Sequence, residues 1–530
     1  MTNQVQYPEA LQRKAGLLEL ASDPYCDILI IGGGATGLGI ALDGASRGYR
    51  VILLERADFA KGTSGRSTKL IHGGVRYLEQ GNIRLVREAS IERALLCKNA
   101  PHLVSNQTFI IPLFTYWEKI KYTIGLKAYD WIAGTMSLGS SGFLSREKTL
   151  EQVPGIKSEG LIGSVMYHDG QFDDARLALN LAQTAAALGA TLLNYCQVTG
   201  LHKNDSGQVN GVTAIDLETN RKFSIEAKCV VNATGVFVDD ILQMDNHSAE
   251  KSVRPSQGVH LVIDKKFFPS SHAMMIPSTS DGRVLFAVPW HNKVLLGTTD
   301  TPVRETSSEP VALETEINFI LSTASAYLSA KPKRSDVMSV FAGLRPLAAP
   351  KGNSIKSKEI SRSHKILVSP SMLFTMVGGK WTTFRKMAED MVDHVEKELH
   401  WPHKRTRTVH LPVHGHALVL QKSDPFAFYG SDGEHIRAMM MASNKQPWIS
   451  EKLSVHPAQV VWAVRNEMAR TVEDVLSRRT RSLLLDARES MRMAPAVAAI
   501  MAHELGKDEA WIQRQVEAYN TIARNYALNS

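Results

Sequence analysis

The chain has 530 residues, of which 44% are hydrophobic, and its 61 basic and 53 acidic side chains give a net charge of +8. This length predicts two or more structural units with a large core. The excess of positive charge is compatible with an anionic substrate or membrane surface, but it lacks the concentrated basicity of a protein that binds nucleic acid.

Four cysteines form no CxxC pair and no metal-ligand spacing, so we expect a reducing, cytoplasmic compartment and no metal site. Residues 1–24 precede the first clear element as an N-terminal extension, with no apolar core of the signal-peptide type. No run of about 18 apolar residues occurs, so we expect no helix that crosses a membrane.

Residues 26–56 read as a strand, a glycine turn, a helix and a second strand. The apolar run Ile28–Ile31 is followed by Gly32, Gly34 and Gly37 in the pattern G-x-G-x-x-G, and Glu55 ends the second strand. The glycines permit the tight turn, the approach of a pyrophosphate and close packing of helix on strand. The helix N-terminus offers N–H groups to phosphates, and the glutamate can accept hydrogen bonds from a ribose. The pattern therefore predicts a dinucleotide site.

A second α/β signal spans 176–235 and ends in a strand followed by Ala233-Thr234-Gly235. Residues 253–375 are rich in strands and turns (VHLVID, VLFAVPW, KVLLGTTD, KILVS), which predicts an antiparallel sheet interleaved with the first domain. The chain returns to helix at 378–399, and a linker near 400 precedes a helical remainder. A chain that returns to its cofactor after such a long excursion favours FAD over an exchangeable NAD.

We therefore expect an α/β fold. A Rossmann-like FAD-binding domain with an interleaved antiparallel-β substrate domain takes up residues 25–399, and a C-terminal helical domain takes up 400–530.

Several motifs in order resemble the FAD-dependent, quinone-linked glycerol-3-phosphate dehydrogenase family. They are GGGATGLGIALDGASRG, GTSGRSTKLIHGGVRYLE, NATGVFVDD, GTTD, GLRPL, ISRSH, GGKWTTFRKMAE and VRNEMARTVEDVLSRRTRSLLLD, and they span roughly residues 25–525. The resemblance implies oxidation of sn-glycerol 3-phosphate to dihydroxyacetone phosphate, with hydride transfer to non-covalent FAD. It further implies that ubiquinone or menaquinone in a membrane accepts the electrons.

The resemblance also implies catalytic roles for His260, as the base for the C2 hydroxyl, and for Arg345, which would line the substrate pocket beside the flavin. The sequence leaves open how these two residues divide the acid–base role. A histidine in a strand can equally be structural, and an arginine at a strand end is often only solvated. The residues implied for binding the phosphate substrate are Arg76, Tyr77, Arg362 and Lys380.

The loop GTSGRSTKLIHGG carries short hydroxyls that can bond the flavin pyrophosphate and ring edges, namely Thr63, Ser64, Ser67 and Thr68. Arg66 in this loop is either an added phosphate contact or a surface residue. His72 raises a covalent flavin linkage as an alternative, although the resemblance favours non-covalent FAD. The remaining flavin contacts that the resemblance implies are Lys69, Leu70, His72, Gly74, Val198, Ala233, Gly235, Gly343, Gly379 and Thr382.

The segment 115–143 mixes Trp117, Tyr122, Tyr129 and Trp131 with lysines, which suits an amphipathic helix in a membrane interface. A helix packed on the protein with a solvated lysine face is the alternative. The arginine-rich segment 465–481 is a second candidate, but nearby acidic residues favour an internal ion-pair network there. We expect peripheral attachment to the inner face of the cytoplasmic membrane, and the sequence leaves a homodimer open.

Three other functions compete with a quinone-linked dehydrogenase. They are an oxygen-using glycerol-3-phosphate oxidase, a related flavin dehydrogenase for another hydroxy acid, and a flavoprotein without turnover. The set Arg76, His260, Arg345 and Lys380 argues against the last of these.

Overall fold

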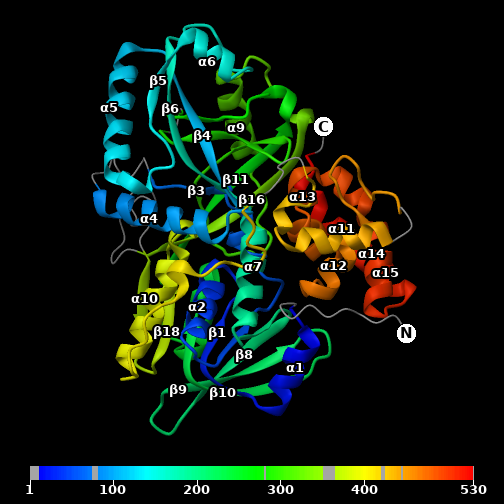
Figure 1. Cartoon of the computed structure of the whole chain (residues 1–530). Helices are drawn as coiled ribbons and strands as arrows, with labels where there is room; N and C mark the ends of the chain where they lie inside the picture. The colour runs from blue at the N-terminus through cyan, green and yellow to red at the C-terminus, as the bar shows by residue number, and fades with distance from the viewer. Residues whose placement is uncertain are drawn as a thin grey trace.

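The computed structural model describes residues 11–74, 82–277, 279, 282–349, 364–418, 424–442 and 446–528. Two large sheets and a C-terminal group of helices make up the molecule (Figure 1). The mixed α/β class that the sequence predicts is confirmed, including the nucleotide-binding sheet, the antiparallel sheet and the helical C-terminal part.

The first sheet, here the nucleotide sheet, has the path β17-β18-β10-β1-β2-β7, and its strands from β18 to β7 run parallel. Its centre is apolar because β1 is buried on both faces from Ile28 to Ile31. The strands are β1 Tyr25–Ile31, β2 Val51–Leu54, β7 Thr191–Leu193, β8 Cys196–Lys203, β9 Val209–Asp216, β10 Lys222–Asn232, β17 Lys365–Val368 and β18 Leu373–Val377.

One predicted strand lies in a different sheet from the one expected. The sequence predicts KILVS in the antiparallel domain, but β17 pairs with β18 at the edge of the nucleotide sheet. Its apolar pattern identifies a strand and carries no information on its partner, because pairing depends on where distant segments meet.

The helices of the nucleotide sheet come from distant parts of the chain. The helix α2 (Ala35–Ser46), which follows the glycine turn, packs against α7 (Asp174–Ala187) and α10 (Phe384–Glu398). At the other end of the sheet, α1 (Arg13–Ser22) packs on β7, and Arg13 forms a buried ion pair with Asp216. The described part of the N-terminal extension is therefore packed on the domain.

The second sheet has the path β15-β11-β14-β13-β12-β4-β6-β3, with β16 on β11 and β5 on β6. The helix α5 (Tyr116–Ala133) packs on β4 and β6, whereas α9 (Glu314–Tyr327) packs on β11, β13 and β14. The strands are β3 Leu70–Ile71, β4 Val104–Leu113, β5 Gly142–Ser145, β6 Gly163–Phe172, β11 Val253–Asp264, β12 Ala273–Ile276, β13 Leu285–Trp290, β14 Lys293–Gly297, β15 Thr301–Pro302 and β16 Val337–Ala348. The remaining helices of this half are α4 Ile83–Asn99 and α6 Arg146–Gln152, whereas α8 Val238–Asp245 packs on β18 and β8 of the nucleotide sheet.

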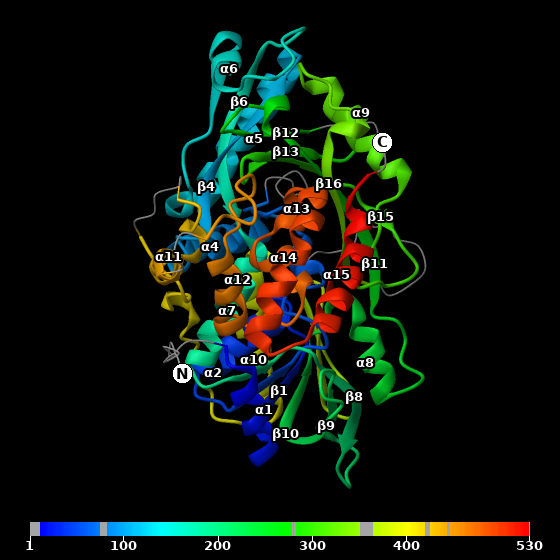
Figure 2. The ribbon, with the colours of Figure 1, turned by 90° about the vertical axis from the view of Figure 1, so that its right-hand side faces the viewer.

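The C-terminal helices form one group, orange to red in Figure 2. They are α11 Asp432–Ala442, α12 Pro457–Asn466, α13 Ser482–Leu485, α14 Ala487–Leu505 and α15 Glu509–Ala523, with a π-helix at Asp474–Arg479. The predicted ion-pair network in the arginine-rich segment is confirmed. Its pairs are Arg465–Glu504, Arg470–Glu218, Arg478–Glu473, Arg478–Asp474, Arg479–Asp58 and Arg481–Asp173.

Candidate functional site

The glycine turn between β1 and α2 is built for close approach of the backbone to a ligand. Gly32 has a φ of +110°, a conformation that favours glycine. A Cβ on Gly37 would overlap the carbonyl oxygen of Gly32, so the helix can pack this closely on the turn only with glycine at position 37. The N-terminus of α2 thereby opens onto a cavity that Gly34, Ala35 and Thr36 help to line.

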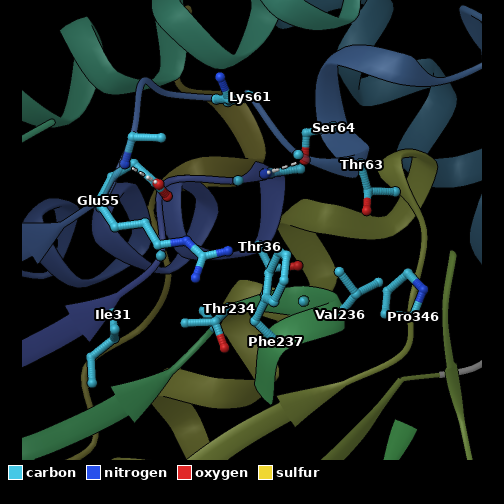
Figure 3. A pocket seen from close by; sticks show the side chains of 18 of the residues that line it. Ile31, Thr36, Glu55, Lys61, Thr63, Ser64, Thr234, Val236, Phe237 and Pro346 are labelled. Atoms are coloured by element: carbon cyan, nitrogen blue, oxygen red, sulfur yellow. Dashed lines mark hydrogen bonds between the residues drawn. The ribbon is translucent and has the colours of Figure 1, made fainter. Parts of the chain in front are cut away.

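This cavity has a volume of about 300 Å³ (Figure 3). Its walls come from the glycine turn, the end of β2 with the loop after it, the start of β8, the end of β10 with the turn after it, and residues 378–381. The structure brings together here ten of the residues predicted from the sequence: Gly32, Gly34, Glu55, Thr63, Ser64, Val198, Ala233, Gly235, Gly379 and Lys380.

Glu55 is fixed at the end of β2 by two backbone groups. Its carboxylate accepts the N–H of Gly33 at 2.6 Å and the N–H of Ala57 at 2.8 Å. Burial raises the pKa of Glu55, and the two N–H groups oppose that rise. A carboxylate held at this place suits the hydroxyls of a ribose.

Ser64 connects the loop after β2 to two other parts of the site. Its hydroxyl accepts the N–H of Ala35 at 2.9 Å, at the start of α2 (Figure 3). Its carbonyl accepts the indole N–H of Trp381 at 2.9 Å. Ser64 therefore orients the helix N-terminus and holds the segment that carries Lys380.

Sequence reasoning missed an aromatic wall of the cavity. The guanidinium of Arg56 lies over the ring of Phe237, 4.0 Å from its centroid, and both residues line the cavity. In the sequence, these two residues could have been identified only by their positions, because Arg56 follows Glu55 and Phe237 follows the NATG motif. The same lining contains Val198, the carboxylate of Glu55 and the N-terminus of α2. Apolar and aromatic surface for a base, a carboxylate for a ribose and free N–H groups for phosphates are what the ADP half of a dinucleotide requires, so the residues present fit such a group.

Other predicted cofactor residues have their side chains engaged within the protein. Asp174 accepts hydrogen bonds from the backbone and the hydroxyl of Ser67, at 3.1 and 2.7 Å, and pairs with Lys69 at 2.6 Å. Lys69 and Asp174 are both fully buried. Among the predicted cofactor residues, those outside the lining of this cavity are Gly37, Ser67, Thr68, Lys69, Leu70, His72, Gly74, Gly343 and Thr382.

Arg66 has a third role that neither sequence alternative included. It is buried, donates to the carbonyl of Ser308 at 2.8 Å, and pairs with Glu309 at 2.7 Å. It therefore anchors the loop to residues 308–309, which precede α9.

His260 lies in the middle of the antiparallel sheet, opposite Phe341 in β16 and Gly297 in β14. Its ring stacks on Phe341 with centroids 4.9 Å apart, and its Nε2 lies 2.9 Å from the hydroxyl oxygen of Thr68. Burial, followed by the charges of Arg345 and Lys69, lowers the pKa of His260 well below its usual range. The imidazole is therefore neutral at neutral pH.

Arg345 is held by the GTTD motif of the chain. Its guanidinium donates to the hydroxyl of Thr298 and the carbonyl of Thr299, both at 3.0 Å, and pairs with Asp300 at 3.1 Å. The structure thus brings Thr68, His260 and Arg345 together, and it adds Thr298 and Asp300, to which the sequence assigns no role.

The predicted substrate ligands are only partly described. Arg76, Tyr77 and Arg362 lie outside the described residues. Lys380 follows Gly378 and Gly379, which have φ values of +79° and +92°, and precedes a 3₁₀ turn at Trp381–Thr383. This turn places it on the wall of the cavity beside Trp381.

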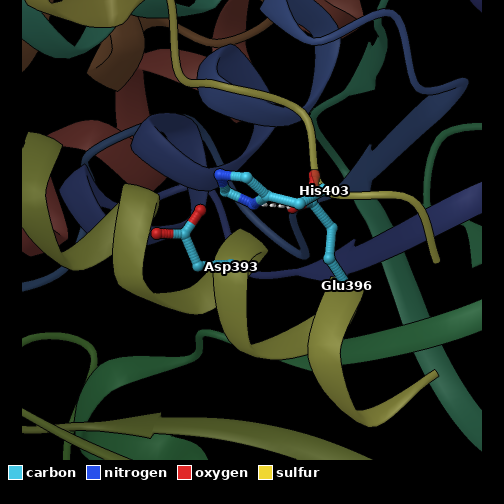
Figure 4. A group of neighbouring side chains, drawn as sticks. All are labelled: Asp393, Glu396 and His403. Carbon is cyan, nitrogen blue, oxygen red and sulfur yellow. Dashed lines mark hydrogen bonds and ion pairs between the residues drawn. The ribbon is translucent and has the colours of Figure 1, made fainter. Parts of the chain in front are cut away.

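One acidic cluster has the spacing of metal ligands. Asp393, Glu396 and His403 offer atoms within 4.8 Å of one another (Figure 4). Arg47 lies against both carboxylates, at 2.6 Å from Asp393 and 3.3 Å from Glu396, and His403 bonds Glu396 at 2.8 Å. The guanidinium supplies the positive charge that the carboxylates need, so this cluster ties α10 to the end of α2.

Comparison with known proteins agrees with this geometry. Residues 27–384 match the family described as FAD dependent oxidoreductase, and residues 423–512 match the C-terminal domain of alpha-glycerophosphate oxidase. The human mitochondrial glycerol-3-phosphate dehydrogenase is 39% identical, over 96% of this chain and 74% of that protein. The enzyme of the same name from Schizosaccharomyces pombe is 36% identical, over 91% of this chain and 85% of that protein.

Two solved structures extend the comparison. The glycerol-3-phosphate dehydrogenase from Bacillus halodurans, complexed with FAD, has a TM-score of 0.79 and 30% identity, and covers 98% of this chain and 99% of its own. The L-alpha-glycerophosphate oxidase from Mycoplasma pneumoniae, with FAD bound, has a TM-score of 0.57 and 16% identity, over 73% of this chain and 98% of its own, and therefore shares the fold alone. The chain is an oxidoreductase with FAD as its cofactor, and it belongs to the FAD-dependent glycerol-3-phosphate dehydrogenase family.

Proposed function

We propose that this chain oxidises sn-glycerol 3-phosphate to dihydroxyacetone phosphate and that a membrane quinone, ubiquinone or menaquinone, takes the electrons. Bound FAD supplies the acceptor for the hydride that leaves C2. The observation that carries the proposal is a neutral, buried His260 close enough to the cationic Arg345 for its charge to lower the pKa of the imidazole. The relatives of this chain are named glycerol-3-phosphate dehydrogenases.

His260 and Arg345 have complementary tasks in this reaction. A neutral imidazole can accept the proton of the C2 hydroxyl. The guanidinium of Arg345, fixed by Thr298 and Asp300, stabilises negative charge that develops on the C2 oxygen. Lys380, together with Arg76, Tyr77 and Arg362, is proposed to bind the phosphate group.

Mixing the FAD-loaded protein with glycerol 3-phosphate without oxygen tests the reaction. We expect loss of the absorbance of oxidised flavin, because the substrate reduces it, and no loss with glycerol, which lacks the phosphate. In Lys380→Ala the concentration of glycerol 3-phosphate needed for half-maximal bleaching should rise roughly 10- to 100-fold, while FAD stays bound. The reason is the loss of a hydrogen bond to a charged group, which is worth about 1.5–3 kcal/mol.

The exposed Lys397 on α10 offers the control, and Lys397→Ala should bleach like the unaltered protein. A yellow protein whose flavin stays oxidised would exclude glycerol 3-phosphate as the substrate. Turnover in air distinguishes the two electron acceptors. Hydrogen peroxide formed in stoichiometric amount would identify an oxygen-using oxidase, whereas reduction of added quinone would identify the dehydrogenase.

The outer face of α5 supports attachment to a membrane surface. No helix in the described ranges is both long and apolar enough to cross a bilayer. The helix lies along the edge of the antiparallel half, on the side opposite the C-terminal helices (Figure 1). Its exposed large side chains are Tyr116, Trp117, Ile120, Ile124 and Trp131, and the two tryptophans are 72% and 84% exposed.

One of the aromatic residues that the sequence assigned to this interface does not belong there. Tyr129 is 2% exposed on the inner face of α5, where Arg93 donates to its hydroxyl at 2.9 Å. Lys119 covers the ring of Phe143, and Lys127 donates to the carbonyl of Ser141. The exposed face of α5 is therefore apolar and aromatic, with basic side chains at its border, as an interfacial helix requires.

Replacing both Trp117 and Trp131 with glutamate should weaken binding to vesicles of phosphatidylglycerol and phosphatidylethanolamine by at least about tenfold, because each indole loses apolar burial in the interface. Sedimentation with the vesicles measures this loss. The control Leu18→Glu alters another exposed apolar residue, on α1, and should bind as before. If the double variant binds the vesicles as well as the unaltered protein, α5 is not the membrane-binding segment. If, in addition, the substitutions change the sedimentation coefficient of the protein measured without lipid, this face of α5 is the contact of a homodimer.

A further inference from the structure

The C-terminal helices contact the loop that forms one wall of the cofactor cavity. This loop, residues 57–66, follows Glu55 and contributes Ala57, Ala60, Lys61 and Thr63 to the lining. It is coupled to the rest of the site, because the N–H of Ala57 bonds Glu55 and the N–H of Ala60 bonds the carbonyl of Gly33 at 3.0 Å. The position of the loop therefore sets the position of both Glu55 and the glycine turn.

Asp58 is the most deeply buried link between the two parts. Its carboxylate accepts from Nε of Arg478 at 2.5 Å and pairs with Arg479, and all three side chains are buried. Burial opposes ionisation, but the charges of Arg479 and Arg478 lower the pKa of Asp58 to about 2. The pair is therefore fully charged at neutral pH, and its partners both lie in the π-helix of the C-terminal part.

Lys61 is the second link. Its ammonium lies 2.5 Å from Glu473 and 3.3 Å from Glu309, and Glu473 in turn pairs with Arg478 at 2.8 Å. In Figure 3 this side chain lies at the upper edge of the cavity, and its nitrogen points away from Thr36 and Thr234. The acidic partners therefore hold Lys61 as part of the wall.

Glu309 closes the network on the far side of the loop. It pairs with Arg66 at 2.7 Å and accepts from the hydroxyl of Tyr526 at 3.0 Å, close to the described end of the chain. Three charged residues of the loop, Asp58, Lys61 and Arg66, are thus held from the C-terminal side directly or through Glu309.

We propose that the C-terminal helical part is a clamp for the cofactor, in which Arg478, Arg479 and Glu473 act as positioning residues that hold loop 57–66 in its FAD-binding conformation. A neutral loop would depend on a few backbone hydrogen bonds, whereas charges fixed in low-dielectric surroundings define one arrangement. The affinity for FAD then depends on residues more than 400 positions away in sequence from the glycine turn.

The test compares two buried arginines of the C-terminal part in the full-length protein. Arg478→Gln removes one of the two arginine partners of Asp58 and one of the two cationic partners of Glu473. Arg481→Gln is the matched control, because Arg481 is as deeply buried but pairs with Asp173, outside the loop. FAD dissociation constants come from fluorescence quenching on reconstitution of the apoprotein, and thermal midpoints of the apoprotein report the loss of stability.

We expect Arg478→Gln to raise the dissociation constant of FAD about tenfold or more, whereas Arg481→Gln should change it less than about twofold. Both substitutions should lower the thermal midpoint of the apoprotein. With saturating FAD, Arg478→Gln should regain the KM for glycerol 3-phosphate of the unaltered protein. An equal rise in both variants, or none in Arg478→Gln, would overturn the clamp. Should Arg478→Gln fail to fold, Glu473→Gln, which removes one of the two acidic partners of Lys61 on the cavity wall, takes its place with the same expected direction.

The measurement also separates the clamp from the proposed reaction, because FAD binding is read without any substrate. A protein that fails to oxidise glycerol 3-phosphate but loses FAD selectively in Arg478→Gln would still contain the clamp.

Discussion

Replacing Gly37 with alanine should weaken FAD binding at least about 100-fold, close to 3 kcal/mol, because the added Cβ would overlap the carbonyl oxygen of Gly32. The helix α2 must then move away from the turn, and its N-terminal N–H groups leave the position where phosphates bind. Titration of the apoprotein with FAD, followed by flavin fluorescence, measures the effect.

Gly200→Ala is the control for this change. Gly200 lies in β8 of the same domain, and a Cβ at this position would meet nothing within 4 Å. Its FAD affinity should match that of the unaltered protein. A Gly37→Ala protein that binds FAD with unaltered affinity would mean that the turn relaxes without cost and that glycine is not required at position 37.

The parts of this fold that local sequence determines were predicted correctly. The strand, glycine turn, helix and acidic strand end follow from adjacent residues, so the sequence alone is enough to group Gly32, Gly34 and Glu55 around one cavity.

The parts that depend on distant partners were not predictable in this way. Nothing near Arg66 indicates that Glu309 will meet it, and nothing near Asp58 indicates Arg478. Tyr129 and Trp131 are both aromatic residues of the same helix, yet Tyr129 is buried and Trp131 is exposed. The difference comes from which side of α5 faces β4 and β6. Charge and aromatic content therefore predict that a segment interacts, whereas the identity of its partner is a property of the tertiary fold.

Lys69 is the residue where sequence and structure lead to different expectations for the same experiment. As a cofactor contact, its loss should weaken FAD binding directly. As the fully buried partner of Asp174, it should matter for FAD only by holding Ser67 and the loop on α7. The two roles separate when the lysine and its partner are changed singly and together.

We expect Asp174→Ala to destabilise the protein by about 3–5 kcal/mol, because it leaves the ammonium of Lys69 buried without a counter-charge. A clear fall of the thermal midpoint would report this, whereas Glu314→Gln, which breaks the exposed pair with Arg334, should leave the midpoint unchanged. Replacing a buried ion pair with apolar side chains is often close to neutral, so Lys69→Met combined with Asp174→Leu should recover most of the lost stability.

The double variant then decides the role of Lys69. Recovery of FAD affinity together with stability means that the ion pair is structural, as its geometry indicates; recovery of stability alone means that the ammonium also binds the cofactor. Removing Lys69 has a further consequence at His260, because the charge of Lys69 lowers the pKa of that imidazole. Its loss should raise this pKa, so the acidic limb of the pH profile of kcat/KM should move to higher pH in the double variant. An unchanged limb would show that His260 is not the group whose protonation limits the reaction.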